Sequence, residues 1–156
     1  MKLEIAARQA LEALEYNDGF LYWKSNGKRA GTTTSQGYIR IHHGENFYLA
    51  HRLIFFLHHN YLPKEIDHID GNKSNNEIKN LRAATTIQNQ QNARKRKDNV
   101  SGIKGVHLHK KTGKWCAALK VNGKPKHLGL FSEPEAARKA VEMARQQFHG
   151  EFMNHG

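Results

Sequence analysis

The chain has 156 residues, room for one domain or two small ones, and its 25 Lys and Arg outnumber 14 acids, giving a net charge of +11. With 38% hydrophobic residues and a mean hydropathy of −0.78, small separate cores are favoured over one large core. The longest apolar stretch, residues 53–57, is too short to cross a bilayer, and acids near the N-terminus argue against a signal peptide. The composition therefore excludes a membrane span and indicates a polyanionic partner, nucleic acid before a membrane surface.

The first sixty residues predict a helix followed by short strands. Leu3, Ala7, Ala10 and Leu14 recur at helical spacing, which favours a short N-terminal helix. We expect strands at residues 20–23, 38–41 and 47–50, with a turn at 27–31. An apolar helix at residues 51–60 should then end before Pro63.

The next segment predicts strand, loop, strand and helix. Residues 66–69 and 81–84 form the strands, and Gly71 with the polar run 72–76 forms the loop. Thr85 and Gln88 make a capping-box pair, so a helix should begin at Thr86 and carry Asn89 in its first turns.

The last part of the chain begins with a basic segment, residues 94–102, which we interpret as a solvated linker and domain boundary. Eleven Lys or Arg and one acid, Asp98, lie between residues 94 and 126. Strands are predicted at 105–109, 115–121 and 126–131, the last two joined by an Asn-Gly hairpin turn. Ser132 and Glu135 make a second capping box, opening a helix through about residue 148.

Four polar residues in the middle of the chain carry the chemistry. Asp67 and His68 are adjacent, Asn80 follows His68 by twelve positions, and Asn89 follows nine positions later. Together with the strand–loop–strand–helix pattern, this resembles the ββα-metal (HNH) nuclease motif, in the variant whose third residue is Asn. Phage-type homing endonucleases are the family it resembles, over residues 15–92. Asp67 and His68 can reach one site only if their strand ends or twists there, because adjacent strand residues face opposite sides.

The resemblance implies a role for each of these residues. Asp67 and Asn89 would hold one divalent cation per chain, Mg²⁺ or Mn²⁺, through oxygen ligands. His68 would be the general base that deprotonates a water beside the phosphodiester. Asn80 would not touch the metal, but would hydrogen-bond loop backbone and fix the direction of His68.

Each of these residues can also be explained by an ordinary structural role. Taken singly, Asn80 could be a turn residue and Asn89 a surface residue; the four together favour the nuclease. Asp70 belongs to an Asp-Gly pair and is interpreted as a turn former. His51 is interpreted as a packed or capping residue, and Arg52 as a candidate phosphate contact.

The C-terminal part resembles the DNA-binding domain of the ethylene-response-factor (Apetala-two) type, which phage endonucleases also carry. The matching segments are SGIKGV at 101–106, GKWCAALKVNGK at 113–124, LGLF at 128–131, EAA at 135–137 and HGEF at 149–152. In that family the exposed sheet face enters the DNA major groove. The positions that match its reading residues here are His107, His109, Ala118, Lys120 and His127.

These positions depart from the family in their chemistry. The arginines expected there are His or Lys and Ala118 replaces an acid, so bidentate guanine readout is largely missing. We therefore expect binding dominated by phosphates, with weak sequence specificity. The predicted DNA contacts are Arg52, Arg94, Lys95, Arg96, Lys97, His107, His109, Lys114, Lys120, Lys124 and His127.

The sequence thus predicts an α+β protein with two domains. Residues 1–93 would be an HNH nuclease domain with extra antiparallel strands, and residues 103–156 a three-stranded antiparallel sheet packed on one helix. The expected function is metal-dependent cleavage of double-stranded DNA by a monomer, with a dimer as the alternative, in a bacterial host cytoplasm. The single residue Cys116 suits a reducing compartment. The competing hypothesis is a DNA-binding regulator or architectural protein on a nuclease-like scaffold; RNA is an alternative substrate, although the sequence shows no aromatic platform for single strands.

Overall fold

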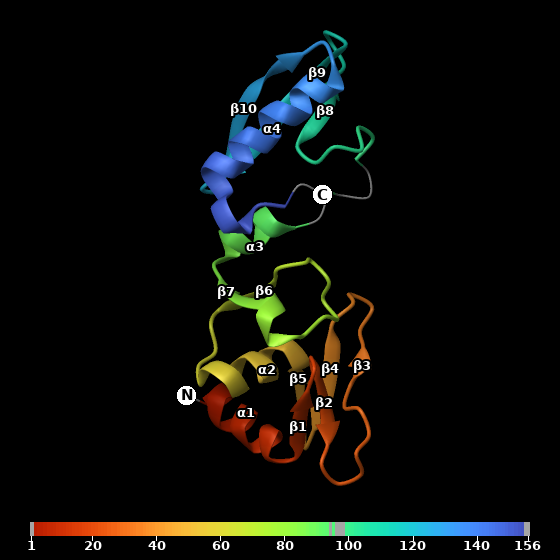
Figure 1. The fold of residues 1–156 in the computed structure, drawn as a ribbon, viewed down its shortest axis with the longest axis vertical. Coiled ribbons are helices and arrows are strands. Elements are labelled where there is room, and N and C mark those ends of the chain that lie inside the picture. Colours follow the sequence, from red (N-terminus) through yellow and green to blue (C-terminus); the bar gives the residue numbers. More distant parts are fainter. Residues whose placement is uncertain (1, 94, 96–98, 155–156) are drawn as a thin grey trace. The chain divides into compact units, whose positions relative to one another are not determined.

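The computed structural model describes residues 2–93, 95 and 99–154, and the chain divides into two compact units, residues 1–84 and 85–156 (Figure 1). The predicted boundary lies at the basic segment 94–102, but the division falls at the start of the helix that carries Asn89. That helix therefore groups with the C-terminal unit.

The first unit consists of two helices and short antiparallel strands. Its strands pair as β1–β2, as β3–β4–β5 and as β6–β7. In chain order the elements are α1 (Lys2–Glu12), β1 (Leu14–Asn17), β2 (Phe20–Trp23), β3 (Thr32–Thr33), β4 (Ile39–His43), β5 (Asn46–Leu49), α2 (Ala50–His59), β6 (Glu65–His68), the 3-10 helix η1 (Ile78–Asn80) and β7 (Leu81–Ala84).

The core of the first unit gathers around α2. Leu53, Ile54 and Phe56 of this helix are at most 2% exposed and share one cluster with Ile41 of β4 and Leu21 of β2. The helix packs against α1 and several strands, and it also contacts β7. Burial of this apolar stretch in the first unit positions the β6–β7 hairpin that carries the candidate site.

Two expectations for the first unit were wrong, one at Leu14 and one at Ala50. Leu14 does not continue the first helix: α1 ends at Glu12, and Leu14 begins β1, paired with Trp23. Leu14 is buried in the same core as Ala7 and Ala10, but it reaches that core from a strand and not from the helix. Neither β1 nor the two-residue β3 was predicted, and Ala50 starts α2 rather than ending the strand before it.

The second unit contains a three-stranded antiparallel sheet, in the order β10–β9–β8, along which α4 lies (Figure 1). Val106 and Ala117 of the sheet and Ala137 and Val141 of the helix form its core. Its elements are α3 (Thr86–Asn92), β8 (Val106–His109), β9 (Lys114–Val121), β10 (Lys124–Phe131), α4 (Pro134–His149) and the 3-10 helix η2 (Gly150–Phe152).

The two predicted capping boxes had different outcomes. The first is confirmed: Thr85 is the N-cap of α3, and both reciprocal hydrogen bonds with Gln88 are present. The second is wrong, because α4 begins at Pro134 with Glu133 as N-cap and no side-chain cap hydrogen bond. Proline is favoured at the first helical position, where its fixed φ suits the helix and its missing N–H costs nothing.

The two buried clusters agree with the small separate cores that the composition predicts. Throughout the described ranges, no helix combines the length and the apolar character needed to span a membrane.

Candidate functional site

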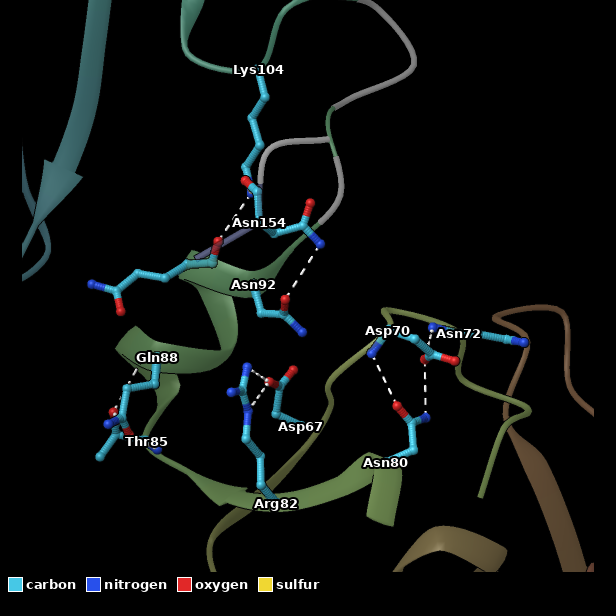
Figure 2. Close-up of polar contacts among 11 residues, drawn as sticks. Asp67, Asp70, Asn72, Asn80, Arg82, Thr85, Gln88, Asn92, Lys104 and Asn154 are labelled. Carbon is cyan, nitrogen blue, oxygen red and sulfur yellow. Dashed lines mark hydrogen bonds and ion pairs between the residues drawn. The ribbon is translucent and has the colours of Figure 1, made fainter. Parts of the chain in front are cut away.

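Asp67 lies in β6 opposite Arg82 of β7, and the two side chains form a buried ion pair. Arg82 donates from Nε (2.8 Å) and Nη2 (2.7 Å) to Oδ2 of Asp67, which is 3% exposed (Figure 2). Two donors on one oxygen fix the direction of the carboxylate. The cross-strand pairing of Asp67 with Arg82 thus fixes the orientation of the predicted metal ligand, Asp67.

His68 is the last residue of β6 and is buried among other polar and aromatic side chains. Its Nε2 lies 3.0 Å from Oδ1 of Asn76. Its ring packs edge-on against His51 of α2, with centroids 5.1 Å apart, and near Tyr38, with centroids 6.1 Å apart. Asn76 therefore holds one ring nitrogen of His68, and two rings limit its rotation.

Burial lowers the pKa of His68 below its ordinary value of 6.5. The hydrogen bond with Asn76 and the carboxylates of Asp70 and Asp67 act to raise the pKa but do not outweigh burial. The imidazole is therefore neutral at pH 7, which is the form that can accept a proton.

The loop between β6 and η1 is organised by Asn80 and Asp70. The amide of Asn80 accepts from the Asp70 N–H (3.0 Å) and donates to the Asn75 carbonyl (2.8 Å) and to Asp70 Oδ1 (3.0 Å) (Figure 2). Asp70 also accepts from the Asn72 N–H at 2.7 Å. Burial acts to raise the pKa of Asp70, but these hydrogen bonds outweigh it and hold the pKa below its usual range.

Asp67 and His68 are both buried at the end of β6. Ile66, Asp67 and His68 are all buried, so both faces of this strand are covered. The strand stops at His68, and Gly71 then turns the chain with φ +67° and its N–H bonded to the His68 carbonyl. Among the described residues, no three His, Cys, Asp or Glu side chains cluster as a metal site. A cation at this site would therefore take fewer than three ligands of these types from the described residues, which is compatible with Mg²⁺ because that ion keeps several of its waters.

Asn89 is the fourth residue of α3, in the second unit. Its backbone N–H donates to the Thr85 carbonyl at 3.0 Å, so it belongs to the first hydrogen-bonded turn. The capping box sets where this helix begins, and with it the position of Asn89 along the helix.

The predicted DNA contacts fall into three groups. His107, Lys114, Lys120, Lys124 and His127 are exposed on the C-terminal sheet, while His109 is half-buried, its Nδ1 2.9 Å from Thr112 Oγ1. Arg52 donates to the Pro63 carbonyl at 3.2 Å, and exposed Lys95 to the Gly102 carbonyl at 2.9 Å. Arg94, Arg96 and Lys97 lie outside the described residues.

The first unit has an aromatic and basic surface that the sequence did not indicate. Arg40 lies over the ring of Phe47, with its Cζ 4.8 Å from the ring centroid, and Phe47 is 63% exposed. With Trp23, Arg29 and His42 they surround a hollow of about 350 Å³, and none of the described residues that line it is acidic. The signal was the alternation in β4, whose exposed residues Arg40 and His42 are basic, with His42 paired to the exposed Phe47 of β5.

Sequence reasoning missed two partners in the candidate site, Asn76 and Arg82. Asn76 stands in a run of turn-forming residues and resembles its neighbours until the loop is folded. Arg82 could have been found, because the hairpin register places it directly opposite Asp67.

Comparison with known proteins identifies the class of this site. Residues 48–91 match the family of HNH endonucleases, a range that runs from β5 to α3 and contains Asp67, His68, Asn80 and Asn89. The chain thus carries an HNH endonuclease domain, the domain of metal-dependent nucleases that act on DNA.

A phage relative extends the match. Protein 3.8 of Escherichia phage T7 is 33% identical over 87 residues, which cover 56% of this chain and 71% of that protein. The chain belongs to the family of this phage protein. No solved structure matches the chain.

Proposed function

We propose that this protein is a metal-dependent endonuclease of the homing or nicking type, which hydrolyses phosphodiester bonds in double-stranded DNA. The observation that carries the proposal is His68, buried at the end of β6 beside Asp67 and held by Asn76, within the HNH match. A nuclease needs such a positioned, neutral imidazole, whereas a purely architectural protein has no use for it.

His68 is the general base. Nε2 of His68 lies 3.0 Å from Asn76 Oδ1, and this hydrogen bond holds the imidazole that takes a proton from the attacking water. The packing of His51 and Tyr38 against the ring limits its rotation, which keeps the imidazole directed at one place.

Asp67 and Asn89 are the proposed ligands of one Mg²⁺ or Mn²⁺ per chain. When bound, the cation would supply positive charge near the developing phosphorane oxygens and the leaving 3′-oxygen. Arg82 orients the Asp67 carboxylate and offsets its charge in the interior. Asn80 acts at a distance, because it holds the loop that follows His68 through Asp70 and Asn75.

The C-terminal unit is proposed to bind duplex DNA as a module of the ethylene-response-factor type. Its sheet exposes five Lys and His side chains at the predicted positions, and no acidic residue occurs between residues 99 and 132. The basic segment 94–102 would add phosphate contacts and connect binding to cleavage. One catalytic site per chain suits a monomer that nicks one strand in the cytoplasm of a bacterial host.

Incubation of the full chain with supercoiled plasmid tests this function. We expect relaxed circles in Mg²⁺ or Mn²⁺ and none in EDTA, with linear DNA only if two chains act together. A protein that binds the plasmid but leaves it supercoiled in every divalent metal would be a DNA-binding regulator instead.

A further inference from the structure

Lys104 makes an unusual contact for a lysine in a basic module. Its ammonium is half-buried and donates to two backbone carbonyls at 3.0 Å, those of Gln91 in α3 and Asn154 near the C-terminus (Figure 2). Gln91 lies in the last turn of α3, where carbonyls lack partners within the helix and the helix dipole favours a cation.

The backbone of Lys104 is itself held from the other side. Arg145 of α4, 3% exposed, donates from Nη2 to the Lys104 carbonyl at 2.6 Å. At Gly105, with φ +83°, a Cβ would lie 2.8 Å from the Ala118 carbonyl oxygen and 3.1 Å from Val141. The segment is thus pressed against the sheet and α4, and a continuous set of contacts runs from the core of the second unit to the end of α3.

A second contact reaches the same end of α3. Nδ2 of Asn154 donates to Oδ1 of Asn92 at 3.3 Å, and Asn92, the last residue of the helix, is 3% exposed. The 3-10 helix η2, just before Asn154, packs against α3. We call Lys104 and Asn154 the α3 clasp.

Burial of the charged ammonium of Lys104 costs free energy of solvation. Burial and the nearby Arg145 lower the pKa of Lys104 to about 8. Within residues 2–93, 95 and 99–154, no carboxylate pairs with its ammonium, so backbone carbonyls alone replace its lost hydration. A lysine that served only solubility or phosphate binding would stay in water, so this one is better explained by the helix that it holds.

We propose that the α3 clasp is a positioning device for the nuclease motif: Lys104 and Asn154, from the C-terminal module, fix α3 and with it the metal-ligand side chain of Asn89. This inference rests on the proposed role of Asn89. Asn89 lies two residues before Gln91 on a helix of only two turns, and a helix this short has little stability without tertiary contacts. Metal binding therefore depends on residues outside the HNH match, which ends at residue 91.

The test compares Lys104→Met and Asn154→Ala with Lys111→Met in the full chain. Lys111 is exposed in the turn between β8 and β9, so its loss changes net charge equally without touching α3. Mn²⁺ binding in the presence of duplex DNA is followed by electron paramagnetic resonance, and nicking is measured across a Mg²⁺ titration. Circular dichroism and DNA binding in EDTA report the fold and the affinity for DNA.

We expect Lys104→Met to raise the half-saturating metal concentration about 10- to 100-fold, the usual effect of losing a residue that orients a metal ligand. Asn154→Ala should give a smaller shift in the same direction. Nicking at saturating metal should approach the wild-type rate, and DNA binding in EDTA should change no more than in Lys111→Met. A mere loss of stability would instead reduce activity at every metal concentration.

Asn89→Ala separates the possible failures. If Asn89→Ala shifts the metal midpoint and both clasp variants leave it unchanged, the clasp has no positioning role. If Asn89→Ala leaves the midpoint unchanged, the ligand assignment is wrong and the inference falls with it. Should Lys104→Met fail to fold, Asn154→Ala decides the question alone, and a wild-type midpoint in that variant overturns the proposal.

Discussion

The imidazole of His68 owes its chemistry to its immediate neighbours. Asn76 holds Nε2 at 3.0 Å, and the rings of His51 and Tyr38 pack against it. The adjacency of Asp67 and His68 and the spacing to Asn80 and Asn89 predicted the candidate site from sequence, and all four residues lie within the HNH match. The partners Asn76 and Arg82 did not emerge, because their roles depend on how a loop folds and on how two strands pair.

Asn76→Ala should lower the nicking rate about 10- to 100-fold at saturating Mg²⁺ with little change in the metal midpoint, because the variant frees the proposed general base, His68, but leaves the proposed metal ligands in place. Asn76→Asp keeps an acceptor oxygen and should retain more activity. Asn46→Ala, an exposed asparagine in β5, is the control. Equal loss in Asn76→Ala and Asn46→Ala would show that the hydrogen bond to His68 does not matter.

His51 makes the first unit sensitive to acid. It is 5% exposed, its Nδ1 has no hydrogen-bond partner among the described residues, and burial, with smaller effects from His68 and Arg52, lowers its pKa from 6.5 to about 3. The folded state therefore binds fewer protons than the unfolded state between these values. The stability that His51 contributes is complete above pH 6.5 and is lost as the pH falls towards 3.

His51→Leu should flatten the acid side of the stability profile. Between about pH 6.5 and pH 3 the free energy of unfolding should fall less steeply than in wild type, by up to about 1.4 kcal/mol per pH unit. Urea titrations followed by Trp23 fluorescence, in a Trp115→Phe background, report the first unit. An unaltered pH slope in His51→Leu would mean that His51 is not the group that titrates.

Among the elements, α3 shows what local sequence can and cannot specify. The capping box at Thr85 and Gln88 predicted its first residue correctly, because both hydrogen bonds are made within four residues. The same pattern at Ser132 and Glu135 failed, because Pro134 determines the start of α4. Leu14 was assigned to the first helix because α1 and β1 both contribute apolar residues to one core. Local periodicity does not show which of these two elements a buried residue belongs to.

These two helix starts give a paired prediction. Thr85→Ala should lower the opening free energy of α3, measured by native-state hydrogen exchange, by about 1 kcal/mol, the usual effect of removing an N-cap. Ser132→Ala should leave α4 within about 0.5 kcal/mol of wild type. A loss of similar size at both sites would contradict the cap assignments.

For the whole molecule, the main questions are where the two units divide and which of them contributes to DNA binding and to cleavage. The composition predicted two small cores, and the structure has them, but the division falls before α3 rather than at the basic segment. A chain ending at Ala93 would keep the predicted catalytic residues yet lose Lys104 and Asn154, so activity and binding are better separated by point variants in the full chain. The sequence did not predict the tertiary contacts of Lys104, because nothing in the sequence distinguishes it from the other basic residues around it.

The exposed sheet of the second unit should account for much of the salt dependence of DNA binding. Replacing Lys114, Lys120 and Lys124 together by Gln should reduce the slope of log affinity against log salt by up to about 2.7, since each phosphate contact contributes roughly 0.9. The control triple, Lys28, Lys64 and Lys139 to Gln, removes the same charge from other exposed positions. If both triples reduce the slope equally, the sheet is not a specific DNA-binding surface.

The variant His68→Ala tests whether the end of β6 is the site of metal-dependent DNA hydrolysis. Wild type and variant are compared on supercoiled plasmid at saturating Mg²⁺, with binding to a short duplex measured in EDTA. We expect duplex affinity to be unchanged and nicking to fall by roughly 100- to 10,000-fold, the effect of losing a positioned general base. A variant that binds equally well and nicks within a few-fold of wild type would contradict the account.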